Sequence, residues 1–215
     1  MKTRLYIIRH GQSVGNKIHR ILGHTDMPLT ELGLLQAEKT AATLADVEVD
    51  AIYASDLLRT METAEPNARL RMMSVIPDAQ LRELFIGDWE GRYLDDIIAS
   101  YPELFEKEWK TEFGTFVSPG GESVAELTER IYAALARISA DHPGKNVIVV
   151  SHGAAIRAFW AKITGLLPKS IGTSLPYASN ASYTVVDYDC DSGLFIPVEY
   201  SHDSHLSDVL TTWKD

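Results

Sequence analysis

Two apolar runs ending in the same dipeptide constrain the fold more than any other feature of this chain. The first is LYIIRHG at residues 5–11 and the second is VIVVSHG at residues 147–153. Short runs rich in β-branched residues that stop at polar residues and glycine are typical of buried strands. The sequence therefore predicts two strands that each deliver a histidine, His10 and His152, to the point where the strand ends.

Strand-like and helical stretches alternate along the 215 residues. Strands are predicted at 4–8, 49–54, 146–150 and 182–188. Helices are predicted over 29–47 with Thr30 as N-cap, from Ser55 to an end or kink near Pro66, and from Ser123, with Glu126 at capping-box spacing, to Pro143-Gly144. This alternation predicts an α/β fold: a mostly parallel sheet covered by helices on both faces, in a three-layer α/β/α sandwich.

The charge and cysteine content limit the classes of partner and compartment. The net charge of −10 argues against nucleic acid or an anionic membrane as the main partner. Residues 1–25 nevertheless contain Lys2, Arg4, Arg9, Lys17 and Arg20 and no acidic residue, which fits either a small anionic ligand or a solvated charge cluster. A single cysteine, no secretory signal and no membrane-spanning apolar run predict a cytoplasmic protein.

An aromatic-rich segment interrupts the alternation. Residues 85–116 hold eight of the chain's nineteen aromatic residues on short helical pieces, one of which starts at Pro102. We expect a single domain over 1–215, with a small helical cap inserted at about 85–121 over one edge of the sheet. Its aromatic residues serve either packing or the wall of a substrate pocket.

Five polar side chains fall near strand ends, where open parallel sheets bind their ligands. Arg9 and His10 end the first strand, and His152 ends the strand at 146–150. Arg59 lies about one helical turn beyond the strand at 49–54, and helical side chains lean back toward the N-terminus. Glu83 follows a short extended run around MSVIP. We therefore expect these groups to converge at one edge.

Such a set suits phosphoryl transfer. Two guanidinium forks bind the oxygens of a phosphate, and an imidazole among cations stays neutral and nucleophilic. The second imidazole stabilises charge in the transition state, while a carboxylic acid, Glu83, protonates the leaving oxygen. Backbone N–H groups after Gly11 and Gly153 are expected to add anion donors. Water then hydrolyses the phosphohistidine, with the same carboxyl acting as base.

Plain structural roles and a metal site are the alternatives. Arg59 has Glu62 and Glu65 within reach on its own helix, and Glu83 is flanked by Arg82. Histidine with carboxylate also binds zinc. Two arginines at the same edge would repel a cation, and the chain has no His-x-x-x-His or cysteine pair, so no metal is expected.

Six motifs, in order, carry a resemblance to a known family. RHGQSVGN, GHTDMPLTELGLLQA, ASDLLRTMETA, ELFIGDWEG, PGGES and VVSHGAAIRA together resemble the histidine phosphatase superfamily, in its phosphoglycerate mutase-like branch. The resemblance implies a flavodoxin-like sandwich and a phosphohistidine intermediate without metal or other cofactor. It implies that His10 is the nucleophile and Glu83 the proton donor, and that the phosphate and substrate are bound by Arg9, Gln12, Ser13, Asn16, Gly23, Arg59 and His152.

Family analogy further favours a phosphatase over a phosphoglycerate mutase. Mutases of this family resemble one another in a longer insertion that carries an Arg-Arg pair, whereas residues 85–121 offer only Arg92, Lys107 and Lys110. A phospholigand-binding module without activity is a third reading, although none of the implied catalytic residues is missing. The expected partner is a small phosphorylated metabolite, with no nucleic acid and no membrane.

Overall fold

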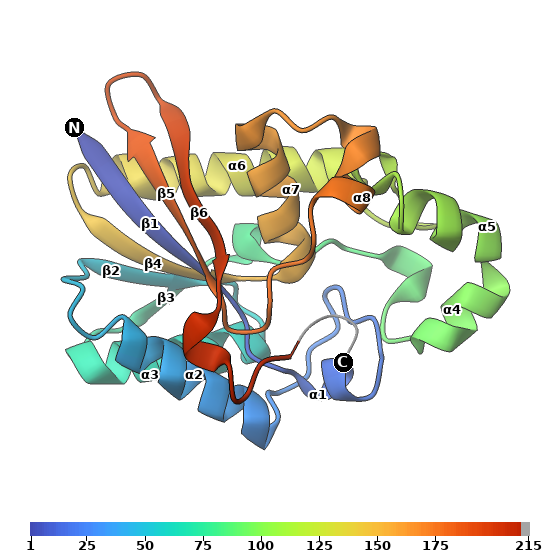
Figure 1. The fold of residues 1–215 in the computed structure, drawn as a ribbon, viewed down its shortest axis with the longest axis horizontal. Coiled ribbons are helices and arrows are strands. Elements are labelled where there is room, and N and C mark those ends of the chain that lie inside the picture. The colour runs from blue at the N-terminus through green and yellow to red at the C-terminus, as the bar shows by residue number, and fades with distance from the viewer. Residues whose placement is uncertain (212–215) are drawn as a thin grey trace.

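The computed structural model describes residues 1–211, which form a six-stranded sheet with helices on both faces (Figure 1). The strands are β1 (Lys2–Arg9), β2 (Ala51–Ala54), β3 (Val75–Pro77), β4 (Asn146–Ser151), β5 (Tyr183–Asp189) and β6 (Leu194–His202). They lie in the order β3-β2-β4-β1-β5-β6. The first four in sequence are parallel and the last two antiparallel. The predicted mostly parallel α/β/α sandwich is confirmed.

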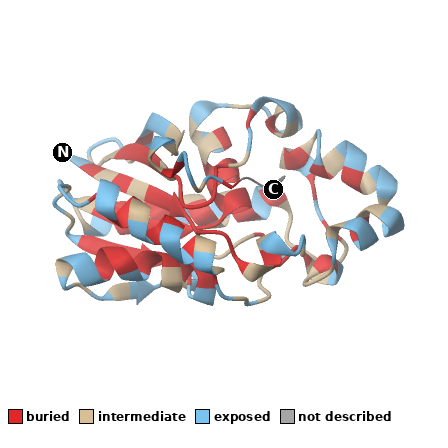
Figure 2. Ribbon diagram, turned by 60° about the horizontal axis from the view of Figure 1, so that its bottom comes forward, coloured by how far each residue is buried: buried red, intermediate tan, exposed pale blue. Residues whose placement is uncertain are grey.

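Two pairs of long helices cover the sheet. The pair α2 (Glu31–Thr43) and α3 (Leu58–Arg71) lies on one face, and the pair α6 (Val124–Asp141) and α7 (Gly153–Thr164) lies on the other (Figure 1). Successive strand side chains point to opposite faces. Hence Ile7 packs in the core beneath α6 and α7, while Ile8 packs in the core beneath α3. Buried residues accordingly concentrate in the sheet and on the inner helix faces (Figure 2).

The predicted helix starts of α2 and α6 are confirmed. The Thr30 hydroxyl accepts the Gly33 N–H over 3.0 Å, and Ser123 forms a reciprocal capping box with Glu126. The buried face of α2 consists of small and polar residues, whereas Leu34 and Leu35 are each 47% exposed. The N-cap residue therefore predicted the start of this helix correctly, whereas the positions of its leucines do not indicate its buried face.

The predicted start of α3 and an end near Pro66 are both wrong. The helix begins at Leu58 rather than at Ser55, because the Ser55 carbonyl and hydroxyl bond to Thr60 and His152. It also continues through Pro66 to Arg71. Proline removes one backbone hydrogen bond, but Pro66 is buried in a turn that packs against the sheet. Tertiary packing therefore overrides the local break.

The edge strand β6 was not predicted. It contains Pro197, and proline within an apolar run argues against a central strand. In the structure β6 pairs only with β5, so it lies at the edge of the sheet, where a missing N–H is tolerated. Pairing with one neighbour thus explains how this proline is accommodated.

The cap segment, residues 85–121, forms the right-hand end of the molecule in Figure 1. It contains α4 (Leu94–Ser100), α5 (Pro102–Leu104) and a π-helical turn (Phe105–Trp109). Trp89, Phe113 and Phe116 have no exposed surface, and Trp89 contacts Phe116 with ring centroids 5.2 Å apart. Most of its aromatic residues therefore serve packing.

Short elements complete the described part of the chain. Besides the helices α1 (Val14–Lys17) and α8 (Ile171–Ser174), they are the 3-10 turns Ala79–Leu81, Gly87–Trp89, Phe113–Thr115, Pro168–Ser170 and Ser204–Leu206. Within residues 1–211, no helix combines the length and apolar character needed to cross a membrane.

Candidate active site

The two histidine-bearing strands, β1 and β4, are parallel neighbours, so their ends meet at one edge of the sheet. Arg9 is in register with Ser151, and the His10 N–H donates to the Ser151 carbonyl over 3.0 Å. The His10 and His152 rings consequently meet edge to face, with centroids 5.3 Å apart. The repeated motif therefore brings the two imidazoles together.

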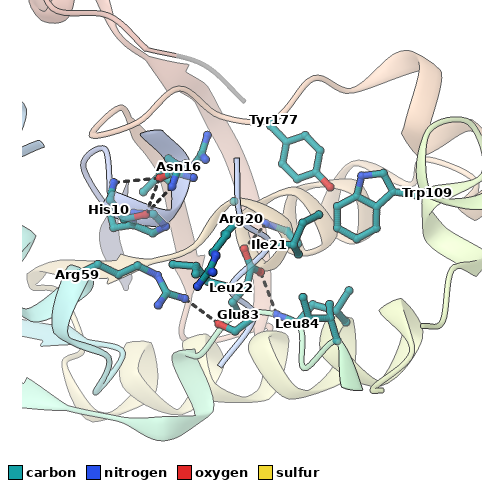
Figure 3. Close-up of a pocket in the computed structure, with 16 residues that line it drawn as sticks. His10, Asn16, Arg20, Ile21, Leu22, Arg59, Glu83, Leu84, Trp109 and Tyr177 are labelled. Atoms are coloured by element: carbon teal, nitrogen blue, oxygen red, sulfur yellow. Dashed lines mark hydrogen bonds between the residues drawn. The ribbon is translucent and has the colours of Figure 1, made fainter. Parts of the chain in front are cut away.

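A small cavity of about 60 Å³ opens beside His10 (Figure 3). Its charged wall consists of three arginines and one glutamate: Arg9, Arg20, Arg59 and Glu83. An apolar part of the wall includes Ile21, Leu84, Ile86 and Trp109. Because the cations outnumber the carboxylate and guanidinium forks match phosphate oxygens, the cavity favours a small phosphate-bearing anion. Among residues 1–211, no three His, Cys, Asp or Glu side chains are arranged to hold a metal ion.

The His10 ring is fixed in orientation and kept neutral. Its Nδ1 lies 2.7 Å from the Gly11 carbonyl, so Nδ1–H donates and Nε2 carries the lone pair. Burial, followed by the charges of Arg59 and Arg9, lowers the pKa of His10 well below its usual range. At neutral pH the ring is therefore an unprotonated imidazole, the form that acts as a nucleophile.

His152 is fully buried next to His10 and is not part of the cavity wall. Its Nε2 lies 2.9 Å from the Ser55 hydroxyl, and its Nδ1 has no hydrogen-bond partner in the described part of the chain. Burial, then Arg59 and His10, lowers the pKa of His152 well below its usual range. A buried ring nitrogen without a partner costs free energy, which an incoming ligand atom can recover.

The two arginines predicted for the site are buried and held by backbone carbonyls. Arg9 donates to the Ala178 carbonyl over 2.5 Å. Arg59 donates to the carbonyls of Gly23 and Thr25 over 2.7 and 3.0 Å, rather than pairing with an acid on its own helix. Burial lowers the pKa of Arg59 to about 10, so it remains a cation at neutral pH. Arg59 also lies 4.0 Å from a carboxylate oxygen of Asp26, at the outer limit of an ion pair, so backbone carbonyls provide the close contacts that orient both guanidiniums.

Glu83 lies at the N-terminus of α7. Its two carboxylate oxygens accept the N–H groups of Ala154 and Ala155, each over 3.0 Å. Its neighbour Arg82 pairs instead with Asp56, so the simple ion-pair reading of Glu83 is wrong. The expectation that these backbone donors serve the ligand is also wrong, because Glu83 already occupies them.

The backbone after β1 differs from expectation in the same way. The Gly11 N–H donates to the Thr63 hydroxyl and the Gln12 N–H to the Gln36 side-chain oxygen. These donors therefore bind the loop to α3 and α2, and are not available to an anion. Their role is to hold the loop that carries His10.

The other four residues that the resemblance assigns to phosphate and substrate binding occupy two kinds of position. Ser13, Asn16 and Gly23 line the cavity. Gln12 does not, and its side-chain oxygen accepts the Thr30 hydroxyl. Gly23 has a φ of +50°, and a Cβ there would lie 2.0 Å from a carboxylate oxygen of Glu90. Glycine is therefore required at this turn whatever it contacts in a ligand.

Sequence reasoning missed two residues that support the site. Glu90, within the GDWEG motif, accepts the N–H groups of His24 and Thr25 and so fixes the loop whose carbonyls hold Arg59. Asn180 donates its side-chain N–H to the His10 carbonyl over 3.1 Å. Glu90 was visible as part of a motif, whereas nothing in the sequence around Asn180 marked it.

Fold and site together define an α/β protein with an arginine-lined cavity at the carboxyl edge of its sheet. The chain belongs to the histidine phosphatase superfamily, since the family model of branch 1 matches residues 5–196. Relatives carry phosphatase and mutase names, which supports an enzymatic function.

Three relatives illustrate this membership. Phosphoserine phosphatase 1 of Hydrogenobacter thermophilus is 33% identical over 187 residues, which cover 86% of each chain. The probable phosphoglycerate mutase GpmB of Yersinia pestis is 35% identical over 167 residues, covering 76% of this chain and 75% of its own. The solved structure of Bacillus stearothermophilus YhfR superposes with a TM-score of 0.89 at 32% identity, covering 95% of this chain and all of that one.

Proposed function

We propose that the protein is a metal-independent phosphatase that hydrolyses small phosphomonoesters through a phosphohistidine intermediate on His10. The observation that carries this proposal is the state of the His10 ring. Its Nδ1–H is held by the Gly11 carbonyl, and its pKa is lowered by burial and then by Arg59 and Arg9. A neutral Nε2 beside a cationic cavity is the nucleophile that phosphoryl transfer needs.

In the first step, His10 Nε2 attacks phosphorus in line, and the bond from phosphorus to the ester oxygen breaks. Arg9 and Arg59 hold the non-bridging oxygens, whose charge they balance. Glu83, in the same cavity wall, gives a proton to the leaving oxygen. An alcohol leaves and the phosphoryl group stays on the imidazole.

His152 supplies a further donor in this scheme. If the Ser55 hydroxyl donates to Nε2 of His152, the ring hydrogen lies on Nδ1, the atom without a partner. This N–H then binds a phosphoryl oxygen as charge develops on it. Ser55 acts here as a positioning residue that selects the useful tautomer.

In the second step, water attacks the phosphohistidine and Glu83 accepts the proton of that water. The phosphorus–nitrogen bond breaks, inorganic phosphate forms, and the His10 lone pair is restored. Glu83 then holds the proton that it needs for the next leaving group. No metal ion enters either step.

The test is turnover of p-nitrophenyl phosphate in the presence of EDTA by the wild type, His10→Asn and a control, His19→Asn. His19 is exposed and has a φ of +53°, which asparagine tolerates. We expect activity in the wild type and the control and none in His10→Asn. Quenching with alkaline detergent and labelled substrate should trap an acid-labile, base-stable phosphoenzyme in the wild type and the control but not in His10→Asn. Loss of activity with chelator, or no turnover of a panel of phosphomonoesters, would overturn the proposal.

A phosphoglycerate mutase is the second candidate, favoured by the relative named GpmB. Mutases of this family are expected to hold a second acidic group of the substrate with cations of the cap segment, but two cations of this cap are engaged elsewhere. Arg92 donates to Ser100, and Lys110 pairs with Glu106. Interconversion of 2- and 3-phosphoglycerate stimulated by bisphosphoglycerate, faster than hydrolysis of either, would establish the mutase instead.

A further inference from the structure

Arg20 is a cation of the cavity wall that has no part in the proposed reaction. It is half-buried, and Figure 3 shows it among the lining side chains with Arg59 and Glu83. Its buried Nε has no hydrogen-bond partner among the residues that the structure describes. Every other arginine in residues 1–211 donates at least one hydrogen bond, whereas the Arg20 guanidinium makes neither a hydrogen bond nor an ion pair with a described residue. A guanidinium group that lines a ligand cavity and makes no hydrogen bond with the protein is therefore a candidate ligand-binding group.

The cap segment holds Arg20 in place. The chain around it pairs with the cap in an extended bridge, in which the Ile21 N–H donates to the Arg92 carbonyl and the Leu94 N–H to the His19 carbonyl. The Arg20 guanidinium carbon lies 4.5 Å from the centre of the Tyr93 ring, in a cation–π contact. This contact orients the fork while leaving its N–H groups available to a ligand.

Within residues 1–211, the charged groups of the cavity wall offer Arg20 no counter-ion of its own. In the proposed phosphatase reaction, on which this step rests, Arg9 and Arg59 balance the two charges of a phosphomonoester. Glu83, the only carboxylate that the described residues contribute to the cavity wall, is bound to the N-terminus of α7. A third guanidinium therefore matches a third negative charge, one that belongs to the part of the substrate beyond the phosphoryl group.

We propose that Arg20 is a specificity-determining residue that binds a carboxylate of the substrate, so that the protein prefers phosphomonoesters of hydroxy acids or amino acids to neutral ones. A carboxylate meets a guanidinium fork with two parallel hydrogen bonds, and the small cavity keeps both acidic groups of such a substrate within reach. Arg20 touches the substrate away from the reacting atoms, so it affects selection more than chemistry.

The test measures binding, so that it does not depend on turnover. Affinities are determined by calorimetry in a His10→Ala background for two pairs of ligands that differ by a carboxylate: phosphoserine against phosphoethanolamine, and 3-phosphoglycerate against glycerol 3-phosphate. Each ratio of affinities is compared among His10→Ala alone, with Arg20→Met added, and with Lys17→Met added. Lys17 is an exposed cation of the same loop and does not line the cavity, which makes it a control for overall charge.

Removing Arg20 should lower the preference for the carboxylated ligand of each pair by about 10- to 100-fold, the range for a charged hydrogen-bonded pair. Arg20→Lys keeps the charge without the fork and should give an intermediate ratio, and Lys17→Met should leave the ratio as it is. Equal losses for both ligands of a pair, or unchanged ratios, would overturn the assignment. The proposed phosphatase function is tested independently of this result, because it would be overturned by the absence of turnover in the wild type.

Discussion

The two buried imidazoles make the stability of the fold depend on pH in a narrow window. Burial, with Arg59 as the next cause, lowers the pKa of both His10 and His152 well below 6.5, the value of an unfolded histidine. As the pH falls from 7.5 to 5.5, both histidines bind a proton in the unfolded chain but stay neutral in the folded chain. The free energy of unfolding therefore falls, by about 1.4 kcal/mol for each ring and about 2.7 kcal/mol for the two.

The assay is urea denaturation at pH 7.5 and 5.5, followed by tryptophan fluorescence. His10→Asn retains an amide near Nδ1 to face the Gly11 carbonyl, and His152→Gln retains one near Nε2 to face the Ser55 hydroxyl. Between pH 7.5 and 5.5, the free energy of unfolding of each variant should fall by about 1.4 kcal/mol less than that of the wild type. Contributions from other groups, such as His205, whose pKa burial also lowers, are common to all three proteins and cancel. Equal losses in the wild type and both variants would refute the claim that these rings are held neutral.

Three substitutions test the proposed chemistry. Arg59→Ala should lower kcat by about 100-fold or more, and an effect confined to KM would contradict its role in the transition state. Glu83→Gln should slow the hydrolysis of alkyl phosphates far more than that of p-nitrophenyl phosphate, whose leaving group needs no proton. Equal losses of kcat on both would argue against Glu83 as the acid. Ser55→Ala should lower kcat by about 10-fold at nearly constant KM, since His152 loses the partner that sets its tautomer, and steady-state kinetics showing only a raised KM would count against this.

The convergence of the two histidines was predictable because it follows from a rule of topology. Two parallel strands that lie side by side present their last residues at the same edge, so LYIIRHG and VIVVSHG had to place their histidines together once the strands were neighbours. The caps of α2 and α6 were predictable for a similar reason, because an N-cap is satisfied within three residues of itself.

The features that escaped prediction depend on partners far away in the chain. Glu83 bonds to N–H groups 71 and 72 residues later, and Asn180 bonds to the His10 carbonyl 170 residues earlier. Pro66 lies inside a helix because its surroundings bury it, which a local rule for proline cannot anticipate. Where a residue's partner is fixed by tertiary packing, local sequence identifies the chemical group but not what that group contacts.

The repeated motif also yields two different chemical groups from one local design, and the difference comes from the neighbours of each ring. His10 donates from Nδ1 to the carbonyl next in its own chain, which leaves Nε2 as an acceptor at the cavity. His152 uses Nε2 for Ser55, the residue that follows strand β2, which leaves Nδ1 buried and without a hydrogen-bond partner in residues 1–211. In the proposed reaction each imidazole keeps a different nitrogen for the ligand, so that one ring attacks phosphorus and the other binds its oxygens. The role of each ring in that reaction therefore depends on which of its nitrogens the protein binds, and not on the position of the histidine in the repeated motif.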